Sequence, residues 1–123
     1  MPDEEVGIAL LGRDYWLVLW APVAGTTSAD IAGLLGEHID WLLSLECTGE
    51  VLLSGPLLEG PGTGPGSGAT VLRAADAEAA AALAAQDPFV RAGLRTYTVQ
   101  RWRVNEGSVS VTLSLGTGRY EWH

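Results

Sequence analysis

The chain has 123 residues, of which 47% are hydrophobic, so it is long enough for one domain with a packed core. It carries fifteen acidic residues against seven basic ones, all of them arginine, for a formal net charge of −8. The absence of lysine excludes Schiff-base chemistry, a lysine-anchored pyridoxal cofactor and a P-loop, and the negative charge disfavours binding to nucleic acid or to anionic membranes.

The single cysteine and the short apolar stretches exclude further classes of protein. Cys47 alone cannot form an intrachain disulfide or a multi-cysteine metal site. The acidic first residues lack the positive charge of a secretory signal, and no stretch reaches the roughly 20 apolar residues of a membrane span. We therefore expect a cytoplasmic protein that contacts no membrane.

The first half of the chain predicts a strand, a helix and a second strand. Residues 14–21 (DYWLVLWA) are apolar on both alternating faces, which is typical of a strand covered on two sides. Over residues 28–47 the apolar side chains follow the three-and-four spacing of an amphipathic helix, with Ser28 as the expected N-cap. A Thr-Gly pair ends this helix, and residues 50–53 form a short strand.

The second half begins with a loop. Residues 59–68 contain five glycines and two prolines, so we interpret them as a flexible flap that could cover a pocket. A strand over 69–75 follows, and Asp76 caps an alanine-rich helix over 77–86. Residues 87–93 then form one extra helical turn.

The last part of the chain predicts two more strands. Residues 94–104 are rich in β-branched and aromatic side chains, as in a strand. After a turn at 105–107, residues 108–115 alternate between Ser or Thr and Val or Leu, which predicts a strand with one buried and one wet face.

The order of these elements is β-α-β, β-α-β and a C-terminal hairpin extension, which predicts an α+β, ferredoxin-like fold. We divide the chain into an N-terminal lead-in (1–14), a ferredoxin-like domain (15–104) and the extension (105–123). Helices on one face of a single sheet leave its other face open, yet the first strand is apolar on both sides. We therefore expect a homodimer formed through the open sheet face.

His38 lies on the apolar side of the predicted first helix, where an imidazole needs a hydrogen-bond partner. One interpretation is a core histidine bonded to a backbone carbonyl. The other pairs it with Asp87, whose carboxylate would fix the tautomer and leave the second ring nitrogen as an acid or base near neutral pH. Asp87 before Pro88 is also a simple helix N-cap, and spacing alone favours that reading.

No other motif in the sequence predicts a specific chemistry. The glycine-rich loop lacks a phosphate-binding motif, no nucleophile elbow occurs, and a metal would need His38 plus several carboxylates on the same helix face. We therefore expect neither a metal nor a cofactor. Ser54 before Gly55 and Pro56 is equally well explained as a turn hydroxyl.

Several short motifs nevertheless form a specific series between Tyr15 and Trp102: His38, Trp41-Leu42, Gly49, Leu52, Ser54-Gly55-Pro56, the alanine-rich helix, Asp87-Pro88-Phe89, Gly93 and Trp102. Their order and spacing closely resemble the YCII-related (YciI-like) family. The resemblance implies a ferredoxin-like domain that dimerises sheet to sheet, as in the dimeric α+β barrels.

In that family a histidine and an aspartate are proposed as an active-site pair, and the matching residues are His38 and Asp87. Ser54 and Gly55 match the family's segment at the pocket mouth and would contact a ligand. The activity suggested for the family is cofactor-free small-molecule chemistry of a lyase or dehydrohalogenase kind. The resemblance thus implies that His38 moves a proton on a small, hydroxylated, cyclic or aromatic substrate, in an elimination or an isomerisation.

Two other functions remain open. In a noncatalytic small-molecule-binding or interaction module, the His38–Asp87 pair would be a structural hydrogen bond. In the related cofactor-free monooxygenases, tryptophans would stack around an aromatic substrate, although no residue pattern selects this function. The chain departs from the family in the loop at 60–68 and in the tail at 105–123, and either segment could reshape the pocket.

Overall fold

The structure, a computed structural model, describes residues 10–123, so most of the predicted lead-in (1–14) lies outside the described residues. The chain divides into a main compact unit, Asp14–Arg103, and a second unit that contains Val104–His123. In chain order the elements are β1 (Arg13–Pro22), α1 (Ser28–Cys47), β2 (Val51–Pro56), β3 (Gly68–Leu72), α2 (Ala77–Ala84), α3 (Pro88–Arg91), β4 (Arg95–Val104), β5 (Val111–Ser114) and β6 (Arg119–Trp122).

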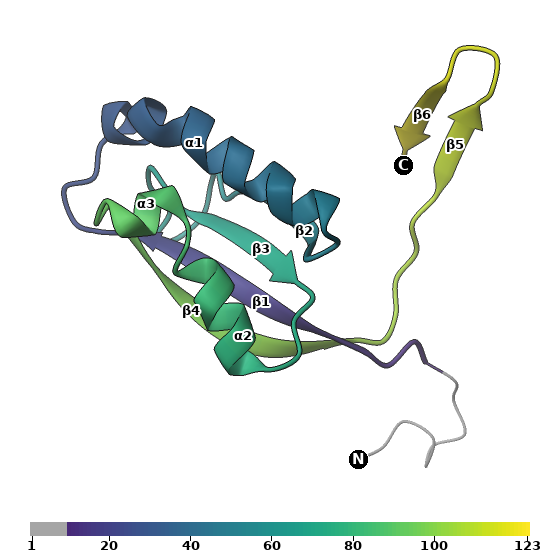
Figure 1. Cartoon of the computed structure of the whole chain (residues 1–123), viewed down its shortest axis with the longest axis horizontal. Helices are drawn as coiled ribbons and strands as arrows, with labels where there is room; N and C mark the ends of the chain where they lie inside the picture. The colour runs from purple at the N-terminus through teal and green to yellow at the C-terminus, as the bar shows by residue number, and fades with distance from the viewer. Residues whose placement is uncertain (1–9) are drawn as a thin grey trace. The chain divides into compact units, whose positions relative to one another are not determined.

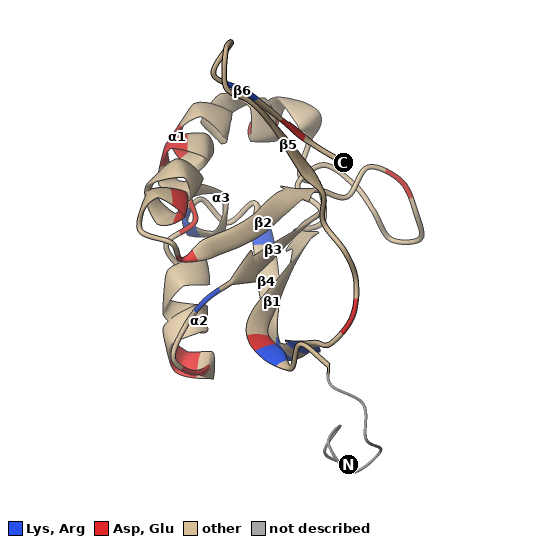
Figure 2. Cartoon of the chain, turned by 90° about the vertical axis from the view of Figure 1, so that its right-hand side faces the viewer, with Lys and Arg blue, Asp and Glu red and all other residues tan. Residues whose placement is uncertain are grey.

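The first four strands form one sheet in the order β2-β3-β1-β4. β3 pairs antiparallel with β1 on one side and with β2 on the other. The three helices lie on the same face of this sheet (Figure 1), and the view turned by 90° shows the same layering (Figure 2). With the β-α-β-β-α-β order, this arrangement confirms the predicted ferredoxin-like α+β fold.

The core lies between the sheet and the helices, and β1 supplies its centre. Val18 and Trp20 are buried and pack together with Leu72 of β3 and with Ala80 and Ala84 of α2. The small alanine side chains let α2 lie close to the sheet, so its helix-favouring composition also serves close packing.

The opposite face of the sheet, here called the outer face, is apolar as well. Leu17 pairs in register with Val71, and Val71 pairs with Leu53, so these three side chains form a row across β1, β3 and β2. Leu19 extends the patch along β1 and is 36% exposed. Both faces of β1 are therefore apolar, while the helices of the main unit cover one of them.

Helix α1 begins one residue earlier than the sequence suggested, because Thr27 and not Ser28 is its N-cap. The Thr27 side chain accepts a hydrogen bond from the backbone of Asp30, and the Asp30 carboxylate accepts one from the backbone of Thr27. Thr27 and Asp30 thus form a capping box, which provides acceptors for backbone N–H groups of the first turn. Ser28 as the N-cap could not form this box with Asp30, because Asp30 would not be the third residue of the helix. No helix within residues 10–123 is long and apolar enough to cross a membrane.

The expectation of a buried face on residues 108–115 is wrong within the single chain. β5 and β6 form a separate antiparallel hairpin, in which Val111 pairs with Trp122 and Leu113 with Tyr120 on one face. The apolar side chains of 108–115 are between 55% and 91% exposed: Val109, Val111, Leu113 and Leu115. The alternation is that of a two-faced strand, but a two-stranded sheet has no second layer of its own to bury either face.

The close approach of β2, β3 and Trp20 at Gly68 gives a first prediction. A Cβ at position 68 would lie 3.0 Å from the carbonyl oxygen of Gly55 and 3.3 Å from Cδ1 of Trp20. We expect Gly68→Ala to lower the free energy of unfolding by about 1–3 kcal/mol, the usual cost of overpacking. Urea denaturation measures it.

Gly36→Ala is the matched control, since a Cβ at position 36 in α1 meets nothing within 4 Å. Alanine favours the helix, so this variant should be about 0.5–1 kcal/mol more stable than the wild type. Equal effects of the two substitutions would contradict the proposed crowding at Gly68.

Candidate active site

A cavity of about 330 Å³ lies within the main unit, between α1, the β2–β3 connection and the start of α3. Most of its lining is apolar, and the polar side chains on it belong to His38, Ser54, Ser67 and Arg95. The remaining lining residues are Trp20, Ile31, Leu35, Ile39, Leu42, Gly55, Pro56, Gly66, Gly68 and Phe89. This combination of an apolar wall with few polar groups is typical of small-molecule sites.

The apolar residues of α1 explain why the cavity exists. The sequence places them on one stripe, as expected for a helix that packs on a core. Only Leu45 of α1 is buried, whereas Leu35 and Ile39 are more than 40% exposed and line the cavity. The stripe therefore lines the cavity at Leu35 and Ile39, while Trp41 and Leu45 further along α1 pack on the core.

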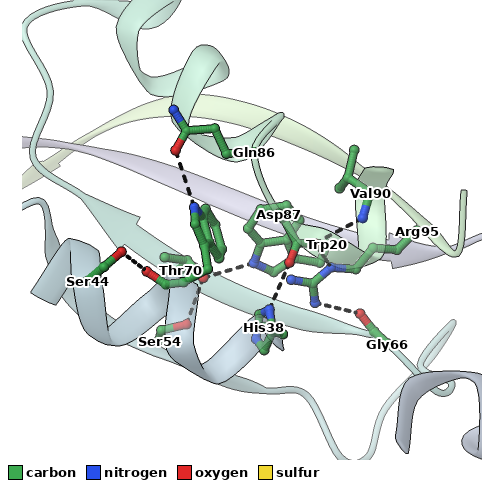
Figure 3. Close-up of polar contacts among 11 residues, drawn as sticks. Trp20, His38, Ser44, Ser54, Gly66, Thr70, Gln86, Asp87, Val90 and Arg95 are labelled. Atoms are coloured by element: carbon green, nitrogen blue, oxygen red, sulfur yellow. Dashed lines mark hydrogen bonds and ion pairs between the residues drawn. The ribbon is translucent and has the colours of Figure 1, made fainter. Parts of the chain in front are cut away.

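His38 and Asp87 meet in the structure, although 49 residues separate them in the sequence (Figure 3). Nδ1 of His38 lies 2.8 Å from Oδ1 of Asp87, and the Asp87 side chain is fully buried. Of the two interpretations of His38, the geometry is that of the pair and not of a bond to a backbone carbonyl. The His38 ring also stacks on Phe89 with ring centroids 4.6 Å apart.

Asp87 is also the N-cap of α3, so its two sequence interpretations are both realised. Oδ2 accepts a hydrogen bond of 3.2 Å from the backbone N–H of Val90 and one of 2.7 Å from Nε of Arg95. The carboxylate thus uses one oxygen for His38 and the other for the helix and the arginine. These contacts connect α1, α3 and β4 at one point.

The ionised state of Asp87 fixes the tautomer of His38. Burial raises the pKa of Asp87, but the hydrogen bonds from His38 and Arg95 and the charge of Arg95 outweigh this effect, and the net pKa is lowered. An ionised carboxylate only accepts hydrogen bonds, so Nδ1 of His38 must carry the proton that it donates to Asp87. Among residues 10–123, Nε2 has no hydrogen-bond partner, and it is therefore the nitrogen available to a molecule in the cavity.

Arg95 is a site residue that the sequence interpretation missed. Its guanidinium is 5% exposed, lies 4.0 Å from the Trp20 ring centroid and 4.9 Å from that of Phe89, and donates through Nη1 to the carbonyl of Gly66. Burial lowers the pKa of Arg95, while the ion pair with Asp87 opposes this effect. The sequence did contain a signal, because the alternation of β4 puts Arg95 on the same face as Tyr97 and Val99, which pack against the core.

The loop between β2 and β3 forms a wall of the cavity, and backbone bonds hold its turns. The N–H of Thr63 donates to the carbonyl of Gly60, and the N–H of Ser67 donates to that of Gly64. Gly66 and Ser67 line the cavity, and the Gly66 carbonyl is the acceptor for Arg95. The loop predicted as a flap is therefore tied to the same arginine that pairs with Asp87.

Ser54 and Gly55, the two predicted ligand contacts, both line the cavity. Ser54 Oγ lies 2.8 Å from Oγ1 of Thr70, its register partner on β3. Oγ1 of Thr70 in turn accepts a hydrogen bond of 2.9 Å from Nε1 of the buried Trp20. Ser54 is thus the outer member of a short polar chain that starts in the core.

Residues 16–103 match the family model of the YCII-related domain. The chain belongs to the YCII-related family. No curated protein matches this YCII-related chain.

A solved structure similar to the YCII-related chain is that of 5-chloro-2-hydroxyhydroquinone dehydrochlorinase (TftG) from Burkholderia phenoliruptrix AC1100, in complex with 2,5-dihydroxybenzoquinone. The similarity has a TM-score of 0.60 at 22% sequence identity and covers 72% of this chain and 92% of TftG. The two proteins therefore share the fold.

The buried Asp87–Arg95 ion pair of this YCII-related protein predicts that Asp87→Asn lowers the free energy of unfolding. Asparagine can still cap α3, but it leaves the buried charge of Arg95 without a counter-charge, so we expect a loss of about 3–5 kcal/mol in the free energy of unfolding at neutral pH. The control is Asp76→Asn at the N-cap of α2. It should change stability by less than about 0.5 kcal/mol, because Asn and Asp cap equally well.

The pH dependence of this difference provides a second measurement. Because the pKa of Asp87 is lowered in the folded protein, its stabilising contribution is fully present above its ordinary value of 3.8 and is lost as the pH falls through the lower folded value. The stability difference between wild type and Asp87→Asn should therefore shrink in acid. A difference that stays constant down to pH values that unfold the protein would contradict an ionised Asp87.

Proposed function

We propose that this YCII-related protein is a cofactor-free small-molecule enzyme of the lyase, dehydrohalogenase or isomerase type, in which His38 transfers a proton and Asp87 orients it. The observation that carries this proposal is the ring of His38 at the wall of a cavity, with Nδ1 bonded to a buried carboxylate at 2.8 Å and Nε2 without a partner among residues 10–123. A neutral imidazole held in this tautomer is a general base at Nε2.

The cavity favours a single small ring as the substrate. Its volume of about 330 Å³ is at the lower end of the range for ligand sites, roughly 300–1,000 Å³, and its walls include Trp20, Phe89 and the aliphatic residues of α1. The dehydrochlorinase TftG, with a similar fold, was solved with a dihydroxybenzoquinone. These features support a hydroxylated aromatic or cyclic substrate that carries a leaving group such as halide.

The proposed elimination is balanced without an oxidant. The reacting form is a ring tautomer in which the carbon that carries the halogen is tetrahedral. Nε2 of His38 removes a proton from a hydroxyl or carbon of this tautomer, the electron pair of the broken O–H or C–H bond forms a new C=O or C=C bond within the conjugated ring, and the electron pair of the carbon–halogen bond leaves with the halide, so the ring loses one proton and one halide in total. The resulting imidazolium is stabilised by the Asp87 carboxylate, and it returns its proton to solvent. General acid–base catalysis of this kind contributes about 10²- to 10⁴-fold, so the substrate must have an activated leaving group.

The decisive substitution is His38→Asn. With 5-chloro-2-hydroxyhydroquinone as the first substrate to be tested, we expect chloride release by the wild type and a reduction of about 10²-fold or more in His38→Asn. The control is His123→Asn, since His123 lies on the terminal hairpin and contacts Thr112. Chloride release by ion chromatography measures both variants.

The same experiment separates catalysis from mere binding. Equal chloride release by His38→Asn and the wild type would contradict a catalytic His38. Binding of the ring without turnover by the wild type, together with a lower melting temperature of His38→Asn, would instead favour the alternative function, a binding module with a structural His-Asp pair.

We also propose that the outer face forms a homodimer. On the side of the sheet opposite the helices, Leu19 and Leu53 are exposed beside the partly buried Leu17 and the buried Val71, which makes this face apolar. Contiguous apolar surfaces of this kind are typical of protein interfaces, and a two-fold axis lets one patch cover its own copy.

Leu19→Glu tests the dimer, because it puts a charge into the proposed contact while the side chain is already partly exposed in the single chain. We expect the wild type to sediment as a dimer and Leu19→Glu as a monomer. Leu58→Glu is the control, since Leu58 is 82% exposed and lies outside the sheet. A monomeric wild type, or a dimeric Leu19→Glu, would contradict the proposed interface.

A further inference from the structure

Three side chains on neighbouring strands form a hydrogen-bonded chain from the core to the cavity (Figure 3). Nε1 of Trp20 donates to Oγ1 of Thr70, and Oγ1 of Thr70 lies 2.8 Å from Oγ of Ser54. Trp20 is 4% exposed and Thr70 is 1% exposed, whereas Ser54 lies at the cavity wall. The direction of the last hydrogen bond decides what Ser54 offers to a bound molecule.

Counting donors and acceptors fixes this direction. An indole N–H can only donate, so the Thr70 oxygen must accept from Trp20. The hydroxyl hydrogen of the buried Thr70 then needs an acceptor, and within residues 10–123 Ser54 Oγ is the one within hydrogen-bond distance. If Ser54 donated to Thr70 instead, the Thr70 hydrogen would be buried without a partner, which native structures avoid.

The geometry points to a donor relay, Trp20 to Thr70 to Ser54, that leaves the Ser54 hydroxyl hydrogen free to bind an acceptor oxygen of a ligand in the cavity. Ser54 is then a ligand-binding residue, and Thr70 and Trp20 are positioning residues that act through it. The inference rests on the proposed function only in that a small ring occupies the cavity.

Two further features hold the relay in place. Gly68 is the register partner of Trp20, and the absence of a side chain there leaves the indole its position beside β3. The guanidinium of Arg95 lies over the indole ring at 4.0 Å and fixes its other side through a cation–π contact. The donor at Ser54 is therefore preorganised by contacts among Trp20, Gly68 and Arg95, which also line the cavity.

The relay assigns complementary roles to two polar groups of the cavity. Nε2 of His38 accepts a proton, and the Ser54 hydroxyl donates a hydrogen bond to an oxygen on which negative charge resides or develops. A ring with an acidic O–H or C–H group and a separate acceptor oxygen satisfies both groups, whereas an oxygen-free ring leaves the Ser54 hydroxyl without an acceptor. We therefore expect substrates to be rings that have a carbonyl or ionised hydroxyl oxygen in addition to the group that gives its proton to His38.

The test compares the binding of two rings, 2,5-dihydroxybenzoquinone and 1,4-dichlorobenzene, by the full-length protein. We expect Thr70→Val to weaken quinone binding about tenfold, the effect of one hydrogen bond, and to leave dichlorobenzene binding unchanged. Thr70→Ser keeps the hydroxyl and should bind the quinone within about threefold of the wild type. The control Thr117→Val, on the terminal hairpin, should match the wild type.

Ser54→Ala keeps the inference testable if Thr70→Val folds poorly, since Ser54 is exposed. Ser54→Ala should bind the quinone about tenfold more weakly than the wild type. The Ser54→Ala/Thr70→Val double variant should bind it no more weakly than either single variant, because the two substitutions remove the same hydrogen bond to the ligand. The indole N–H signal of Trp20 in a ¹⁵N–¹H spectrum should shift in Thr70→Val and stay in place in Thr70→Ser.

The outcomes separate this inference from the proposed enzyme activity. If Thr70→Val and Ser54→Ala lose quinone binding selectively but the wild type releases no chloride, the relay is supported and the proposed enzyme activity is contradicted. Chloride release with unchanged quinone binding in Thr70→Val and Ser54→Ala would overturn the relay and retain the enzyme. A wild type that does not prefer the quinone, or equal weakening for both rings, also overturns the relay.

Discussion

The buried carboxylate of Asp87 is the constraint on which the rest of the structure depends. A charge without exposure to water requires several partners, and Asp87 has three, on three different elements: His38 of α1, the backbone of α3 and Arg95 of β4. The helix that carries the histidine is therefore held to the sheet by the same group that orients the histidine ring. Fold and site share one interaction.

Arg95 extends this constraint to the loop and to the opposite wall of the cavity. Its guanidinium pairs with Asp87, donates to the carbonyl of Gly66 and lies over the ring of Trp20. Trp20 in turn positions Thr70 and Ser54. The proposed acceptor at His38 and the proposed donor at Ser54 thus belong to one connected set of contacts, most of whose members are buried.

The sequence predicted the topology well because each element of the main unit has a clear period or a clear turn. It predicted the His38–Asp87 contact through the family resemblance, since spacing alone also allowed an independent N-cap at Asp87 and a separate core histidine at position 38. Arg95 was missed, although the alternation of β4 places it on the face that packs on the core, because an arginine at the start of a strand is usually exposed. The uncovered face of the β5–β6 hairpin was missed for a related reason, since alternation predicts two faces but not whether a second layer exists.

The cavity itself could not be predicted, because its wall is made of residues that normally form a core. Leu35, Ile39 and Leu42 have the spacing of a packing face, yet they line open space beside His38. An apolar space that is not filled gives up the dispersion contacts and burial that close packing would supply, and it lowers stability relative to a filled core. In this protein the His38–Asp87 contact connects the middle of α1 to the start of α3, and the cavity lies beside it. The same buried contact that holds α1 to the domain therefore also places the His38 ring at the wall of this cavity.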